Sequence, residues 1–117
     1  MRYVLMFGGD PITRESMPPE QARAAQHEVD RWWRSLQLVG TILEGAQLMA
    51  VFSATTVRFA PGGPVIHDGP STAEADAVGG YGLIDVEDLD EALRVAMSWP
   101  VGGFVEIRPV LVRGEPQ

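Results

Sequence analysis

The residues best suited to chemistry lie in the segment HDGPS, residues 67–71. Asp68 can act as a general acid or base if its carboxyl group is buried away from any cation. The same carboxylate could instead accept backbone N–H bonds and stabilise the turn at Gly69-Pro70. His67 is adjacent, but strand alternation points its ring to the other side. Asp68 is therefore the candidate catalytic residue, and a purely structural turn is the alternative.

Two further segments carry polar side chains that could bind a ligand. Glu106 and Arg108 lie two residues apart and share one face of a strand, where an ion pair between strands or subunits is the common arrangement. Arg108 could instead bind the carboxylate of a ligand. The run GGYG at residues 79–82 precedes an apolar strand and not a helix, which argues against a phosphate-binding loop. We interpret this run as a turn in close contact with a sheet.

The composition excludes several classes of function. The chain of 117 residues has 9 basic and 16 acidic side chains and a formal net charge of -7, so it would repel a phosphate backbone. It has no cysteine and 2 histidines, which argues against a transition-metal site and leads us to expect no metal and no cofactor. Residues 1–8 hold too short an apolar run for a signal peptide or a membrane span. We therefore expect a cytoplasmic protein that contacts neither nucleic acid nor membrane.

The apolar pattern predicts four main strands, two long helices and one hairpin. The strands are expected at residues 2–7, 41–51, 80–86 and 104–112, and the hairpin pairs residues 55–59 with 64–67. One helix is expected over residues 18–39, after a polar loop, and a second from residue 88 to the stop at Trp99-Pro100. Asp88 and Glu91 have the spacing of a capping box at the start of the second helix.

This order predicts one α+β domain over residues 1–117, a ferredoxin-like β-α-β-β-α-β arrangement with an extra hairpin. Both helices would cover the same face of the sheet. The opposite face is expected to carry an apolar set of side chains, namely Tyr3, Leu5, Phe7, Tyr81, Leu83, Phe104 and Val110. Such a face needs a cover, and a second copy of the chain is the natural one. Two sheets packed face to face would leave a cavity between them for a small organic ligand.

The segments MRYVLMFGGD, MPPEQ, DGPSTAEADAVGGYGLIDVEDLDEAL and VEIRPV cover most of the chain. In these segments the chain resembles the DGPF-domain branch of the YCII-related family. The resemblance implies a ferredoxin-like dimer, a dimeric α+β barrel, in a family most of whose members have no assigned reaction. It also implies that Asp68 is the motif acid. The fourth motif residue is Phe in the family and Ser71 here, so a small hydroxyl replaces a bulky apolar group.

The broader family pairs an acid of this kind with a histidine on the sheet-facing side of the first helix. At about 100° per residue, His27 lies opposite the apolar stripe between Val29 and Trp32, so we expect it to face solvent. Val29 occupies approximately the position of the family histidine. We therefore expect the His-Asp dyad to be missing from this chain.

Three hypotheses for function follow. The first is a small homodimer that binds an organic molecule in a cavity beside the sheet face, with a site formed by His67, Asp68, Ser71, Tyr81, Glu106 and Arg108. The second is a cofactor-independent isomerase, cyclase or lyase in which Asp68 moves a proton. The third is an interaction module linked to a transcription regulator, whose cavity would be filled by side chains.

Overall fold

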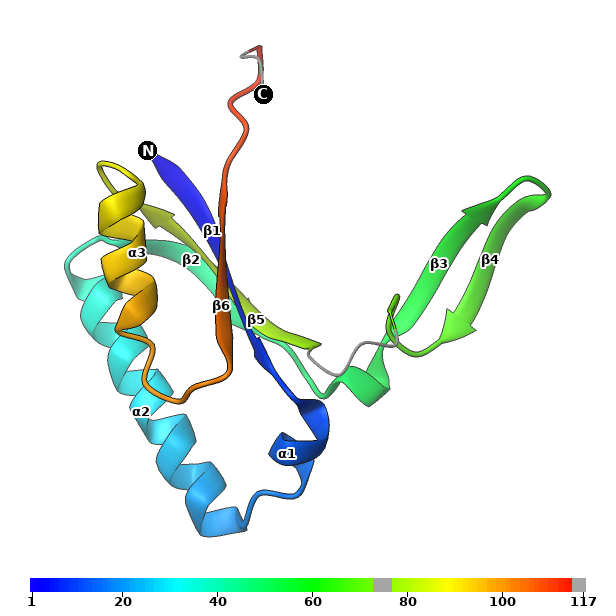
Figure 1. Ribbon diagram of the computed structural model, residues 1–117, viewed down its shortest axis with the longest axis horizontal. Coiled ribbons are helices and arrows are strands. Elements are labelled where there is room, and N and C mark those ends of the chain that lie inside the picture. The colour runs from blue at the N-terminus through cyan, green and yellow to red at the C-terminus, as the bar shows by residue number, and fades with distance from the viewer. Residues whose placement is uncertain (73–76, 115–117) are drawn as a thin grey trace.

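The computed structural model describes residues 1–72 and 77–114, and its centre is a four-stranded antiparallel sheet (Figure 1). The strands are β1 (Arg2–Gly9), β2 (Ile42–Gln47), β5 (Ala77–Asp85) and β6 (Phe104–Pro109), in the order β2-β5-β1-β6. The helices are α1 (Pro11–Glu15), α2 (Pro19–Leu38) and α3 (Leu89–Met97). The protein is therefore of the α+β class.

A separate hairpin leaves this body of the molecule. Strands β3 (Thr55–Ala60) and β4 (Gly63–Asp68) pair with each other after the 3-10 helix η1 (Val51–Ser53), and they project away from the sheet and the helices (Figure 1). The radius of gyration is 16.3 Å. A compact chain of this length would have a radius of about 13 Å. The projecting hairpin accounts for an extended shape, and its two strands are those that the sequence predicts.

The long helix α2 forms where the sequence predicts it and packs one stripe of side chains on the sheet. Trp32 is buried in the core, and Trp33 and Leu36 pack against the same cluster. Proline suits the first turn of a helix because its fixed φ matches the helical value, and α2 begins at Pro19. Within the described ranges, none of the helices has the length and apolar character needed to cross a membrane.

Both shorter helices begin with an aspartate cap. The Glu91 N–H donates to the Asp88 carboxylate at 2.9 Å at the start of α3, as the capping-box pattern predicts. In α1 the Ile12 N–H donates to the Asp10 carboxylate at 2.9 Å. The sequence predicts only a polar loop at α1, because a helix of 5 residues is too short to show apolar periodicity.

The core lies between the sheet and the helices α2 and α3. Leu5 of β1 and Ile84 of β5 have no exposed surface. The Phe7 ring stacks on Trp99 with centroids 4.3 Å apart and meets the edge of Trp32 with centroids 5.5 Å apart. These contacts join the end of β1 to α2 and to the segment after α3.

The prediction that Tyr3, Leu5 and Phe7 lie on the open face of the sheet is wrong. All three side chains are buried in the cluster that packs on the helices. Val4 and Met6 take the open face instead, opposite Leu83 and Tyr81 of β5. The reason is that β1 is apolar on both sides, so its sequence does not reveal which side meets the helices.

Candidate ligand-binding site

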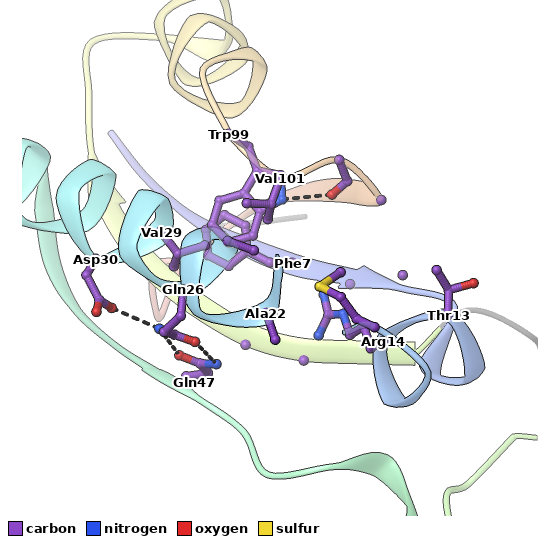
Figure 2. Close-up of a pocket in the computed structure, with 18 of the residues that line it drawn as sticks. Phe7, Thr13, Arg14, Ala22, Gln26, Val29, Asp30, Gln47, Trp99 and Val101 are labelled. Carbon is purple, nitrogen blue, oxygen red and sulfur yellow. Dashed lines mark hydrogen bonds between the residues drawn. The ribbon is translucent and has the colours of Figure 1, made fainter. Parts of the chain in front are cut away.

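A cavity of about 920 Å³ lies between α1, the N-terminal half of α2 and one end of the four-stranded sheet (Figure 2). Small-molecule sites commonly have volumes of roughly 300–1,000 Å³. The inner face of α2 contributes the short side chains of Ala22 and Ala25 here. Further along the helix, the larger side chains of Trp32 and Leu36 fill the space between the helix and the sheet and belong to the hydrophobic core. The change from alanine to large side chains along α2 therefore leaves space at one end of the sheet.

The inner wall of the cavity is aromatic. Phe7, Trp33 and Trp99 all line it. Trp33 lies against Gly45 of β2, where a Cβ atom would overlap the indole ring. Glycine at this position therefore allows Trp33 to lie on the strand and form part of the wall.

One end of the cavity carries a network of amide and carboxylate groups (Figure 2). The Gln26 side-chain amide donates to Asp30 and to the side-chain oxygen of Gln47, each at 2.9 Å. The Gln47 amide donates back to the side-chain oxygen of Gln26 at 2.9 Å. This network ties α2 to β2 and presents the amide groups to the cavity.

The other end of the cavity carries Arg14, from the last turn of α1, with Thr13 nearby (Figure 2). The guanidinium lies against Gly79, where a Cβ atom would overlap its nitrogen. Within residues 1–72 and 77–114, no carboxylate lies within 4.0 Å of Arg14. This end of the cavity therefore has a positive charge that the described side chains do not pair.

The two acids that line the cavity are already engaged. Asp10 accepts hydrogen bonds from the Ile12 N–H at 2.9 Å and the Thr13 hydroxyl at 3.2 Å, and Asp30 accepts from Gln26. An ionised carboxylate has about four lone-pair sites, so both acids keep capacity to accept a hydrogen bond from a bound molecule.

Three of the sequence-predicted site residues lie at the base of the hairpin. His67 is partly buried, Asp68 is exposed, and the Ser71 carbonyl accepts a hydrogen bond from Arg58. Within the described ranges, the Asp68 carboxylate accepts no hydrogen bond. The turn is held by other groups, since the Thr56 hydroxyl donates to the Gly69 carbonyl at 2.7 Å.

The other three lie on the four-stranded sheet, on the face away from the helices. Tyr81 and Glu106 are both opposite Met6 of β1, and Arg108 is opposite Val4. The Arg108 and Glu106 side chains approach to 4.0 Å and are both exposed. The structure thus brings this pair together but separates it from the hairpin residues, and none of the six predicted residues lines the cavity.

The histidine of α2 lies outside the cavity as well. His27 is exposed, whereas Val29 lines the cavity, as the helical spacing predicts. Among the residues that the structure describes, no group of three or more His, Cys, Asp or Glu side chains could hold a metal ion.

The residues that line the cavity were not apparent as a group in the sequence. Arg14 belongs to a helix too short to predict, and Gln47 lies at the end of a strand with a weak apolar pattern. One signal was present: Ala22, Ala25 and Val29 fall on the apolar stripe of α2, and the first two are too small to fill a core.

Comparisons with known proteins support one family. A family model described as the YCII-related domain matches residues 1–112. The chain is also 26% identical over 114 residues to a protein of Rhizobium meliloti (strain 1021) named "Uncharacterized protein R00369", and the match covers 94% of this chain and 92% of that protein.

Proposed function

The chain belongs to the YCII-related domain family, and on this premise we propose that it is a homodimer that binds a small organic molecule in the cavity beside α2. The observation that carries the proposal is the cavity itself, about 920 Å³ in volume, with an aromatic wall and polar groups at both ends. Pockets of this size with apolar walls and a few polar groups are the usual form of small-molecule sites.

The open face of the sheet supports the second part of the proposal. Val4, Met6, Leu83 and Phe104 lie on this face, and each is only partly buried in one copy of the chain. An apolar sheet face in contact with water is unfavourable, and a second copy could cover it. We propose a ferredoxin-like protomer whose sheet packs on that of a second copy, as in a dimeric α+β barrel. Tyr81, Glu106 and Arg108 would then lie in or near the dimer interface.

The hairpin supports an interface between copies in the same way. Val57 and Ile66 are opposite each other on one of its faces, with Phe59 on the same side. Their exposed fractions are 49%, 71% and 86%. Apolar side chains at such exposure on a projecting arm fit contact with another protein surface. In the proposed dimer the arm of each protomer reaches its partner.

The binding proposal is tested by filling the cavity. Ala25 lines the cavity, whereas Ala24 is an exposed neighbour on the same helix and does not. We expect A25W to weaken binding of 2-naphthamide, a neutral planar probe, by roughly tenfold or more, since the indole would occupy its place. Equilibrium dialysis measures the affinity, and A24W should bind as the wild type does.

Two outcomes of this experiment would count against the proposal. Equal affinities of A25W and A24W would place the probe outside the cavity, and no binding to the wild type would contradict a site for planar organic molecules. The variant D68N distinguishes binding in this cavity from the competing enzyme hypothesis, in which Asp68 acts on the bound molecule. Because Asp68 does not line the cavity, D68N should leave probe binding unchanged.

A further inference from the structure

We propose that Arg14 makes one end of the cavity a carboxylate subsite, so that the natural ligand is a planar, largely apolar molecule with a carboxylate group. This inference rests on the proposed binding function and names the chemical class of the ligand. It is carried by the Arg14 guanidinium at one end of an apolar cavity, which no carboxylate of residues 1–72 and 77–114 pairs (Figure 2).

The exposed Arg14 side chain lies where two strands carry glycine. Asp10 caps α1 through the Ile12 N–H at 2.9 Å, which sets the direction of this short helix. The guanidinium then lies beside two strand ends, with its Nε atom 3.9 Å from where a Cβ atom would stand on Gly9. A Cβ atom on Gly79 would overlap the guanidinium itself. Two glycines thus leave the room that the arginine needs at the edge of the cavity.

The described acidic side chains near the cavity do not pair with Arg14. No carboxylate of the described ranges lies within 4.0 Å of it. Asp10 is held by the cap of α1, and Asp30 is held by Gln26 in the network at the opposite end of the cavity (Figure 2). A guanidinium presents paired N–H donors that match both oxygens of a carboxylate. An anionic group of a bound molecule would therefore find a matching donor pair at this end of the cavity.

The rest of the cavity defines the body of the ligand. Between Arg14 and the amide network the wall is formed by Ala22, Val29 and the ring of Phe7 (Figure 2). Trp33 also lines the cavity. Aromatic and aliphatic walls favour a flat apolar group, which can stack on the rings. A carboxylate at one end of such a group would reach Arg14 while the apolar part stays on this wall.

A pair of probes with the same shape tests the subsite. 2-Naphthoate and 2-naphthamide differ in the charge of one group, so the ratio of their dissociation constants measures the preference for a carboxylate. We expect the wild type to prefer 2-naphthoate by roughly tenfold or more, the effect of one charge-assisted hydrogen-bonded pair. In R14Q this preference should disappear, because the affinity for 2-naphthoate should fall further than the affinity for 2-naphthamide.

A control variant distinguishes the loss of the carboxylate subsite from the loss of one positive charge elsewhere on the protein. R34Q removes the same charge from an exposed position of α2 that does not line the cavity, and it should keep the wild-type preference. R14K keeps the charge but lacks the paired donors, and it should show an intermediate preference.

Each remaining outcome decides between the two proposals. Equal binding of both probes to the wild type, or a preference that persists in R14Q, would overturn the carboxylate subsite and leave the cavity as a neutral binding site. Failure of both probes to bind the wild type would contradict the binding function and this inference together. Retained 2-naphthamide binding by R14Q shows that the variant is folded, so a lost preference cannot be attributed to unfolding.

Discussion

At the scale of single residues, Gly45 determines whether the aromatic wall can form. A Cβ atom there would overlap the Trp33 ring and also crowd the backbone of β5 at Tyr81 and Gly82. We expect G45A to lower the free energy of unfolding by about 1–3 kcal/mol, the usual cost of overpacking. Urea unfolding followed by tryptophan fluorescence measures the change.

The matched control is Gly62, at the tip of the hairpin. An added Cβ atom at Gly62 would have nothing within 4 Å, and its φ is not positive. G62A should change stability by less than about 1 kcal/mol. If G45A and G62A had the same small effect, Trp33 would not rest on Gly45 as described.

Individual residues also show where prediction from the sequence succeeds. His27 and Val29 are on opposite sides of a long helix, so the angle between them follows from helical geometry alone, and the structure agrees. Arg14 and Gln47 are brought to one cavity by tertiary packing between α1, α2 and β2. No local sequence pattern indicates how these elements pack together, so the cavity could not be predicted from the sequence.

At the scale of elements, α3 depends on its first turn. The Asp88 carboxylate accepts from the Glu91 N–H at 2.9 Å, and the Glu91 carboxylate accepts from the Glu87 N–H at 2.7 Å. We expect D88A to reduce stability by about 1 kcal/mol, the typical loss of an N-cap, in urea unfolding. Asp90 is in the same turn and forms no cap bond, so D90A should cost only roughly 0.3 kcal/mol. Equal losses would contradict a specific role of the cap.

The elements were predictable to different degrees for a physical reason. The helix α2 and the hairpin have clear signals, namely long apolar periodicity and a glycine-proline turn between two short strands. The orientation of β1 was not predictable, because Val4 and Met6 are as apolar as Tyr3, Leu5 and Phe7. The packing of α2 and α3 selects the second set as the core.

At the scale of the whole molecule, one copy of the chain leaves two apolar surfaces in water. The first is the open sheet face around Leu83, and the second is the face of the hairpin that carries Phe59. The apolar pattern predicts that one face of the sheet needs a cover, but the side chains of β1 predicted for that face are the wrong ones. The open face that the structure shows does include Leu83, Tyr81 and Phe104, as predicted.

The proposed dimer predicts that a charge in the open face separates the copies. Leu83 lies on β5, one of the two inner strands, on the side away from the core. We expect the wild type to have twice the chain mass of 12.7 kDa in light scattering after size-exclusion chromatography. L83E should elute as the monomer, because burial of an unpaired carboxylate between two sheets is strongly unfavourable.

The same substitution on the helical side controls for the added charge. Leu89 is half-exposed at the start of α3 and lies outside the core cluster, so L89E should remain a dimer. Tryptophan emission reports whether L83E keeps its core, since Trp32 and Trp99 pack on the other side of the sheet. A monomeric wild type would contradict the dimer outright. A dimeric L83E would contradict an interface formed by the open face of the sheet.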